Sequence, residues 1–213
     1  MKLTPTKTPF VVKKMFPDYV WEINTAKKEL FLTFDDGPTP EVTPWVLDQL
    51  KRFNAKATFF CIGANIEKHP EIFKRIMEEG HSIGNHTQNH IKGWKTKTKA
   101  YLENVLEAQK TIADQTSNHI NHFRPPYGQI KPKQGKKLMA LGYKIVMWDV
   151  LSFDWDKGIS NEDCLNQVIS KSKAGSIVVF HDSVKASNNM TYALPKVLEY
   201  YSKQGFLFKA IES

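Results

Sequence analysis

Strongly apolar runs alternate along the chain with stretches in which apolar residues recur every three or four positions. The apolar runs predict seven strands, over residues 29–34, 57–62, 81–85, 120–124, 143–150, 176–180 and 205–211. The amphipathic stretches predict six helices, over residues 43–53, 71–80, 98–114, 133–141, 161–171 and 190–203. Strands that are apolar throughout are typical of a parallel sheet covered by helices. The pattern therefore predicts an α/β fold, either a (β/α) barrel or an open doubly wound sheet.

The region before the first strand is expected to pack on this core. We interpret residues 1–28 as an N-terminal extension and residues 29–213 as the main domain. No apolar run approaches the ~18 residues of a membrane span, and the apolar stretch near residue 10 is shorter than a signal-peptide core. A cytoplasmic location is expected by default, or a secreted or cell-wall location if a leader is missing. The extension is expected to wrap the barrel with its aromatic residues, Phe10, Phe16, Tyr19 and Trp21.

Composition adds two expectations. The two cysteines, Cys61 and Cys164, are far apart in the sequence and are interpreted as free thiols. The net charge of +8 allows attraction to an anionic partner. The most basic segment, IKGWKTKTKAY at 91–101, contains Trp94 and Tyr101. This segment could bind a polyanion or stack on a sugar, or it could be a solvated loop.

Polar motifs follow the predicted strands at their carboxyl ends. They are TFDDGP at 33–38, NHTQNH at 85–90, RPPYG at 124–128, WDVLSFDW at 148–155 and VFHDS at 179–183. Barrel enzymes and open α/β enzymes build their active sites at this end of the strands. The five motifs are therefore expected to meet in one site.

His86 and His90 supply half of a metal site. Their spacing of four residues places both imidazoles on the same face if they share one helical turn. Asp35 and Asp36 follow a buried strand, so one carboxylate could complete the ligand set while the other acts as base on an attacking water. Two histidines and one carboxylate leave coordination positions open, as a catalytic metal requires.

The remaining motifs offer the other groups that hydrolysis of an amide or ester needs. Arg124 could orient the base and lower its pKa, and Tyr127 carries the first N–H after two prolines, a candidate oxyanion donor. His181 could protonate a leaving amine.

Three acidic residues compete to orient His181. Asp154 is the first candidate, with Asp149 and Asp182 as alternatives, and Trp155 could form a wall of the pocket. The histidines outside the motifs are assigned to structure or solvent; they are His69, His81, His119 and His122.

The five motifs, in this order, resemble those of the polysaccharide deacetylase family, also called carbohydrate esterase family 4 or the NodB-homology domain. The resemblance extends over residues 29–211. It implies an irregular (β/α) barrel of about seven parallel strands with helices outside. It also implies a catalytic domain that removes the N-acetyl group from N-acetylglucosamine units of a glycan of chitooligosaccharide or peptidoglycan type.

The resemblance also implies a role for each motif. Asp35 would be the catalytic base, while Asp36, His86 and His90 would bind a divalent metal, Zn²⁺ first, with Co²⁺, Ni²⁺ or Mn²⁺ as alternatives. Arg124 would hold the base, the Tyr127 N–H would stabilise the oxyanion, and His181, tuned by Asp154, would be the acid. Substrate contacts are expected from Pro125, Tyr127, Trp155 and Val179.

Two positions depart from the family pattern. Leu151 stands where an acidic residue is frequent, and Val179 stands where leucine is common.

The same base, metal ligands and oxyanion donor would serve an O-acetyl esterase on a polysaccharide such as xylan, or hydrolysis of another small amide. A non-catalytic module that binds a polyanion is the third hypothesis. We expect a glycan partner, no nucleic acid and no membrane span; the oligomeric state stays open, and residues 91–98 and 183–190 are expected to set substrate choice.

Overall fold

The computed structural model describes residues 5–117 and 120–212, so His119 lies outside the described residues. The strands are β1 (Glu29–Asp35), β2 (Thr58–Cys61), β3 (Ser82–Asn85), β4 (His122–Phe123), β5 (Lys144–Ile145), β6 (Val150–Leu151), β7 (Ile177–His181) and β8 (Leu207–Phe208). The helices are α1 (Phe10–Met15), α2 (Val42–Arg52), α3 (Gly63–Lys68), α4 (Pro70–Glu78), α5 (Thr98–Ala113), α6 (Pro132–Ala140), α7 (Asn161–Lys171) and α8 (Ser187–Lys203).

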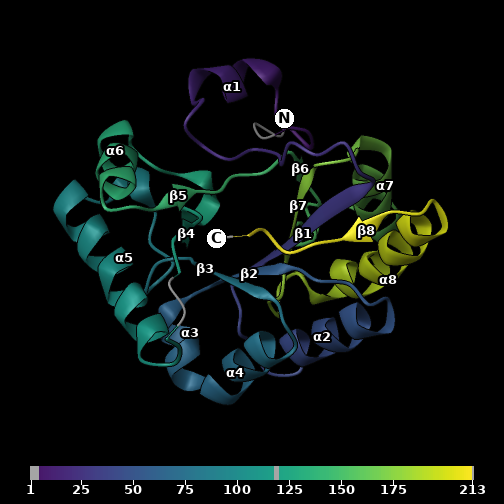
Figure 1. Ribbon diagram of the computed structural model, residues 1–213, viewed down its shortest axis with the longest axis horizontal. Coiled ribbons are helices and arrows are strands. Elements are labelled where there is room, and N and C mark those ends of the chain that lie inside the picture. Colours follow the sequence, from purple (N-terminus) through teal and green to yellow (C-terminus); the bar gives the residue numbers. More distant parts are fainter. Residues whose placement is uncertain (1–4, 118–119, 213) are drawn as a thin grey trace.

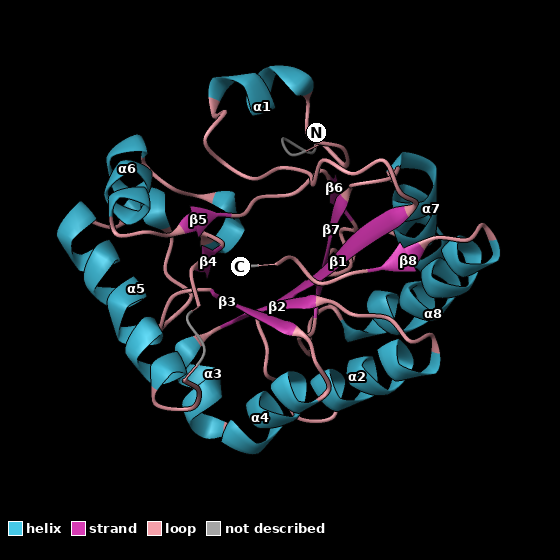
Figure 2. Cartoon of the chain, viewed as in Figure 1, coloured by secondary structure: helices cyan, strands magenta, loops and turns pink. Residues whose placement is uncertain are grey.

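The strands form one curled parallel sheet at the centre of the molecule. Their order is β5-β4-β3-β2-β1-β7-β6, with β8 paired to the start of β1. Helices α2 to α8 lie around the outside of this half-barrel, and the strands lie within (Figures 1 and 2). The predicted parallel α/β architecture is therefore confirmed, with seven strands on one path and β8 as an addition.

Alternation along β1 separates the helix-facing core from the barrel interior, because successive side chains of a strand point to opposite faces. Leu30, Leu32 and Phe34 pack into the large core under the helices, where the Phe34 ring lies 5.0 Å from that of Phe59. Phe31 belongs to a separate inner cluster. The same alternation places Asp35 on the inner face, at the carboxyl end of the strand.

Local signals fix several helix ends. The Ser160 hydroxyl accepts a hydrogen bond from the Asp163 N–H at 3.0 Å, and the Asp163 carboxylate accepts one from the Ser160 N–H, which makes a capping box at the start of α7. Helix α4 begins with Pro70. The chain after α4 turns at Gly80, whose φ of +76° is the left-handed conformation that glycine adopts without strain.

The predicted strand over 143–150 is wrong, because the chain breaks there into β5 and β6. Between them the N-terminal extension inserts: the Val20 N–H donates to the Ile145 carbonyl at 2.9 Å, and the Met147 N–H donates to the Val20 carbonyl at 2.8 Å. Strand β5 therefore pairs with β4, whereas β6 pairs with β7. The extension occupies the gap between these two parts of the sheet.

Ion pairs hold the extension in that gap. Lys7 and Lys13 both reach the buried Asp149 carboxylate, at 2.9 and 2.6 Å. Tyr19 and Trp21 are buried and Phe16 is half-buried, as expected for residues that wrap the barrel. The expectation for Phe10 is wrong: its ring is 68% exposed because α1 turns it to solvent, under the Lys14 ammonium.

The remaining global expectations concern thiols and membrane spans. Cys61 and Cys164 are buried free cysteines, as predicted. None of the helices in the described ranges combines the length and the apolar character that a membrane crossing requires.

Candidate active site

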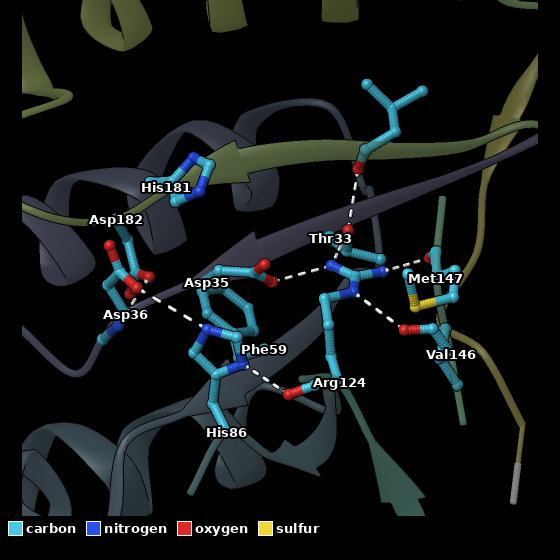
Figure 3. A network of polar contacts seen from close by, with 12 residues as sticks. Thr33, Asp35, Asp36, Phe59, His86, Arg124, Val146, Met147, His181 and Asp182 are labelled. Atoms are coloured by element: carbon cyan, nitrogen blue, oxygen red, sulfur yellow. Dashed lines mark hydrogen bonds and ion pairs between the residues drawn. The ribbon is translucent and has the colours of Figure 1, made fainter. Parts of the chain in front are cut away.

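Asp36, His86 and His90 converge at the carboxyl ends of β1 and β3. The three ligand atoms lie within 4.8 Å of one another. Asp36 Oδ1 is 3.7 Å from His86 Nε2 and 3.1 Å from His90 Nε2. Figure 3 shows the Asp36 carboxylate turned toward the His86 ring, with Asp35 and His181 close by.

The two histidines do not share a helical turn, so that part of the sequence interpretation is wrong. After Asn85 the chain forms a loop in which Thr87 and His90 have φ values of +67° and +53°. The Asn85 side chain accepts a hydrogen bond from the Thr87 N–H at 2.9 Å and supports this loop. The two imidazole rings still lie 5.1 Å apart.

These residues fit a divalent metal ion. Asp36 Oδ1 is buried, yet it makes no well-aligned hydrogen bond within the described ranges. His86 Nδ1 hydrogen-bonds to the Arg124 carbonyl at 2.8 Å, which leaves Nε2 with its lone pair toward Asp36. A backbone carbonyl that fixes the second ring nitrogen is the usual support of a metal-binding histidine.

The protonation states of the ligands also favour a cation. Burial lowers the pKa of His86 to about 4, so this imidazole is neutral near pH 7. Burial raises the pKa of Asp36, but the His90 imidazole, 3.1 Å away, and the charge of His181 outweigh it. The pKa of the Asp36 carboxyl therefore lies below its usual range. A neutral imidazole and a carboxylate are the forms that bind metal.

Asp35 is held by Arg124 on one side of these ligands. Arg124 is fully buried, and its Nη1 donates to Asp35 Oδ1 at 2.7 Å and to the Thr33 hydroxyl at 2.7 Å. Its other nitrogens donate to two backbone carbonyls, those of Val146 at 3.1 Å and Met147 at 2.9 Å (Figure 3). The planar guanidinium is thus fixed at several points, and it fixes the carboxylate in turn.

His181 is held by Asp154 on the other side. The Asp154 carboxylate pairs with His181 Nδ1 at 2.8 Å and accepts a hydrogen bond from the His181 backbone N–H at 2.6 Å. Burial lowers the pKa of His181, but the Asp154 carboxylate outweighs it and raises the pKa to about 9. Among the three candidates, the structure pairs Asp154 with this imidazole. Asp149 is bound to the N-terminal extension instead.

These groups face one cavity of about 480 Å³. Its lining residues are Asp35, Asp36, His86, His90, Tyr127, Gln129, Trp148, Leu151, Trp155, Val179, His181 and Lys185. One wall is apolar, since Leu151 and Val179 pack in a cluster with Trp155. The Trp155 ring lies 4.6 Å from that of His181.

Comparison with known proteins identifies the family of this chain. The sequence model of the family described as polysaccharide deacetylase matches residues 22–146, which is more than half of the chain. The chain belongs to the polysaccharide deacetylase family.

Curated relatives and solved structures agree with this membership. A peptidoglycan-N-acetylglucosamine deacetylase of Bacillus cereus is 35% identical over 194 residues, which cover 90% of each chain. Chitin deacetylase 2 of Saccharomyces cerevisiae is 35% identical over 83% of this chain and 57% of its own. A crystal structure of a peptidoglycan N-acetylglucosamine deacetylase with 4-naphthalen-1-yl-N-oxidanyl-benzamide superposes with a TM-score of 0.88, at 36% identity and over 96% of this chain and 95% of that one. The family is metal-dependent, in agreement with the cluster of Asp36, His86 and His90.

The RPPYG turn of this deacetylase family member carries a strained residue. Tyr127 has a φ of +60°, a conformation that non-glycine residues rarely adopt. Pro126 has no N–H, and the amides of Gly128 and Gln129 donate to the carbonyls of Pro125 and Pro126 at 2.9 and 3.0 Å. No backbone acceptor for the Tyr127 N–H is found within residues 5–117 and 120–212. This amide is therefore the one that the turn leaves for a ligand.

Pro125, expected to contact substrate, is buried and does not line the cavity. Its carbonyl closes the turn instead. Two lining residues, Trp148 and Gln129, were not predicted, and a third, Lys185, lies in the segment 183–190 that was expected to set substrate choice. Trp148 begins one of the five motifs and Gln129 directly follows another, so proximity to a motif was the available signal. The other described histidines, His69, His81 and His122, are not among the lining residues, in line with their assignment to structure or solvent.

Asp182, the second alternative partner for His181, supports the loop that carries the aspartates. Its carboxylate accepts hydrogen bonds from the Gly37 N–H at 3.0 Å and from the Thr43 hydroxyl at 2.5 Å. A Cβ on Gly37 would collide with this carboxylate, so only glycine fits there. Burial raises the pKa of Asp182 to about 7. This buried carboxyl ties the end of β7 to the turn after Asp36.

Proposed function

We propose that this protein hydrolyses the N-acetyl group of N-acetylglucosamine units in a glycan, with release of acetate and a free amine. The main support for the proposal is that two ion pairs, Asp35 with Arg124 and His181 with Asp154, lie on either side of one set of candidate metal ligands. The relatives named above, which deacetylate peptidoglycan and chitin by their names, support the same substrate class.

Asp36, His86 and His90 would hold the metal, and we propose Zn²⁺, with Co²⁺, Ni²⁺ or Mn²⁺ able to replace it. When bound, such an ion supplies Lewis-acid chemistry and lowers the pKa of water. Neutral imidazoles and a carboxylate suit these borderline cations, and three protein ligands leave the open positions that catalysis requires.

Asp35 is the proposed general base. It lies in the cavity, and it accepts a hydrogen bond from Arg124 on one oxygen, Oδ1. The contact with the guanidinium fixes the direction of the second oxygen. That oxygen takes the proton from the attacking water as the water oxygen bonds to the acetyl carbonyl carbon.

Two further groups complete the reaction: one stabilises the negative charge on the carbonyl oxygen, and the other protonates the leaving nitrogen. We assign the Tyr127 N–H to the oxyanion, because that amide has no backbone acceptor in the described chain. His181 gives its proton to the nitrogen as the carbon–nitrogen bond breaks, and acetate and amine leave. A pKa of about 9 keeps this imidazole protonated at neutral pH, ready to act as the acid.

The apolar wall suits the methyl group of the acetyl. Leu151 and Val179 are both nearly fully buried beside His181, and Trp155 packs with them. This wall offers no hydrogen bond to a hydroxyl at the same place, so we propose that it selects acetyl against polar groups. Valine at 179, where the family commonly has leucine, leaves slightly more room for the acyl group.

Acetate release tests the proposal directly. Chelator-treated protein is incubated with chitooligosaccharides and with peptidoglycan glycan fragments, with and without Zn²⁺. Acetate and free amine are then both measured in each reaction. We expect one amine for each acetate, dependent on added metal. Acetate without amine from an acetylated xylan, and none from these glycans, would replace the proposal with an O-acetyl esterase.

A further inference from the structure

The basic segment at 91–101 has no part in the proposed reaction. Tyr101 is fully buried and belongs to the core, with its ring 6.3 Å from that of Phe123. The expectation that Tyr101 could contact a ligand is therefore wrong. Trp94, in the short helix η1 (Gly93–Lys95), is exposed. The lysines of the segment are exposed as well; they are Lys92, Lys95, Lys97 and Lys99.

A second lysine-rich segment, residues 129–144, lies against the first and includes α6. Its lysines are Lys131, which is half-buried, and the exposed Lys133, Lys136, Lys137 and Lys144. Two hydrogen bonds join the segments: the Trp94 indole N–H donates to the Ile130 carbonyl at 3.2 Å, and the Lys131 ammonium donates to the Thr96 carbonyl at 2.8 Å. The two segments therefore form one surface, where α6 lies outside the sheet beside α5 and β5 (Figure 1).

This lysine surface, defined as residues 91–102 and 129–144, accounts for the net charge of the chain. It contains nine lysines and neither aspartate nor glutamate. The whole chain has 30 lysines and arginines against 22 aspartates and glutamates, so the remainder has 21 basic residues against 22 acidic ones. The excess of +8 is thus gathered on two adjoining segments. Charge gathered in this way attracts polyanions over a distance.

Most of these charges are not neutralised within the protein. Lys99 is the one lysine of the surface with an ion-pair partner in the described ranges, Glu103 at 3.8 Å, and its side chain is 90% exposed. Lys92 lies over the Tyr127 ring at 4.6 Å. A polyanion that such ammonium groups neutralise releases its condensed counterions, which favours binding at low salt. The lysine surface therefore keeps its charge available for a partner.

The types of side chain favour phosphate groups without bases. All nine cations are lysines, and the arginines of the chain lie elsewhere, at Arg52, Arg75 and Arg124. Lysine binds a phosphate as a point charge and does not supply the planar fork with which arginine recognises a carboxylate. Trp94 is the only exposed aromatic residue within these fully described segments. Proteins that bind single-stranded nucleic acid stack successive bases on several aromatic side chains.

We propose that the lysine surface binds a linear polymer that carries a phosphodiester in each repeat and no bases, of the poly(glycerol phosphate) type. Nine cations spread over two segments suit repeated charges rather than a single anion. The contacts are ion pairs between the ammonium groups and successive phosphates. This binding goes beyond the proposed reaction, because it uses none of the groups that face the catalytic cavity on either side of the metal ligands. It would hold the enzyme wherever such a polymer occurs together with the glycan.

Binding of labelled poly(glycerol phosphate) to the full chain tests the proposal. Lys133→Gln, Lys136→Gln and Lys137→Gln are combined, because these exposed residues of α6 do not line the catalytic cavity. We expect the triple variant to bind about tenfold more weakly at about 50 mM salt. A plot of log affinity against log salt should become less steep by about two, since each phosphate contact on a single strand contributes about 0.7.

A second triple variant, Lys27→Gln with Lys51→Gln and Lys209→Gln, is the matched control. These lysines are also exposed, and they lie before β1, in α2 and after β8, outside the lysine surface. The two triple variants have the same net charge. The control should bind the polymer nearly as well as the wild type. Equal losses in both variants would show that overall charge governs binding, and would overturn the proposal.

Other polyanions test the class of partner. The wild type is titrated with polygalacturonate, with single- and double-stranded DNA and with vesicles that contain an anionic lipid, all at equal concentrations of charge. Each should bind more weakly than poly(glycerol phosphate). Equal or tighter binding that the α6 variant loses would assign the lysine surface to carboxylates, to nucleic acid or to a lipid surface, and would overturn the proposed partner.

Acetate release separates this proposal from the proposed function. A soluble chitooligosaccharide carries no phosphate, so the wild type and both triple variants should release acetate from it at equal rates. Absence of polymer binding in a wild type that still releases acetate would overturn the role of the lysine surface alone. Absence of acetate release from every glycan, with polymer binding intact, would remove the deacetylase and leave the lysine surface.

Discussion

Two ion pairs flank the metal ligands, and they differ in which member is buried: the cation in one pair and the carboxylate in the other. In the first, Arg124 is fully buried and Asp35 faces the cavity. In the second, the Asp154 side chain is fully buried, and the 16% exposed His181 side chain faces the cavity. Each pair thus has an anchor within the fold and a reactive member at the cavity wall. The anchor is a cation for the base and an anion for the acid.

The difference shows how one fold supplies a base and an acid to the same substrate. The buried Arg124 guanidinium fixes the position of the Asp35 carboxylate at 2.7 Å, whereas the buried Asp154 carboxylate raises the pKa of His181 and so stabilises the form that can give a proton. In each pair, the member that faces the cavity is the one that can exchange a proton with the substrate or the attacking water. The predictions below alter one anchor or one reactive group at a time.

Removal of the cationic anchor should have the largest effect on the protein as a whole. Arg124→Met leaves Asp35 without its partner in a buried site, and loss of one member of a buried pair costs about 3–5 kcal/mol of unfolding free energy. Urea denaturation measures this. Arg75→Met is the matched control, because Arg75 pairs with Asp48 and Glu79 while 35% exposed, and should cost no more than about 1 kcal/mol. Equal losses would contradict the role of Arg124.

Removal of the reactive acid should separate amides from esters. His181→Ala is expected to slow amide hydrolysis about 10²–10⁴-fold, since the amine leaves only after protonation. An acetyl ester should lose less, because an alkoxide needs the proton less. Initial rates on an N-acetyl and an O-acetyl substrate give the ratio. The control His69→Ala, at a half-buried residue off the cavity, should behave as wild type. A uniform loss on both substrates would count against His181 as the acid.

Removal of the Asp154 carboxylate should shift the basic limb of the pH profile of kcat/KM. With Asp154 present, the pKa of His181 is raised to about 9, so the acid is protonated below that pH and activity should fall as the pH rises through about 9. Asp154→Asn removes the carboxylate that raises the pKa of His181 most, while burial still lowers that pKa and the charges of Asp36 and Asp35 still raise it, so the pKa should fall below about 9. The basic limb of kcat/KM should move to lower pH. A limb that stays near 9 would show that another group sets it.

The smallest effect should come from the support beneath the metal ligands. Asp182→Ala removes the acceptor for the Gly37 N–H and for the Thr43 hydroxyl. We expect metal affinity to fall about tenfold, the lower end for groups that support a ligand. Competition with a chelator measures the affinity. Thr43→Val, which removes one of these hydrogen bonds, should have a smaller effect, and unchanged affinity in both would restrict Asp182 to stability.

The parallel sheet and the residues of the site could be predicted from the sequence because both signals are local. Each motif directly follows an apolar strand, and the carboxyl ends of parallel strands meet at one edge of the sheet. The alternation along β1 is enough to turn Asp35 inward. Asp36, His86 and His90 could be grouped by chemistry even though the expected helical turn between the histidines is absent.

The remaining features depend on contacts between distant parts of the chain. The break between β5 and β6 follows from insertion of Val20 beside Ile145 and Met147, which no local pattern indicates. Asp154 was the first candidate to orient His181, with Asp149 and Asp182 as alternatives, and only the tertiary partners of the three carboxylates separate them. The lysine surface is joined by hydrogen bonds from Trp94 and Lys131, which neither of its two segments indicates alone.

The division of labour between two neighbouring aspartates is the claim that everything else rests on. Asp35→Asn and Asp36→Asn are the same change at adjacent positions, so bound zinc and acetate release should be measured on both side by side. Asp35→Asn, loaded with zinc, should retain the metal on dialysis and lose turnover by about 10²–10⁴-fold. Asp36→Asn should lose zinc on dialysis and regain some turnover in excess metal. Equal zinc loss in both variants, or turnover retained by Asp35→Asn, would contradict the account.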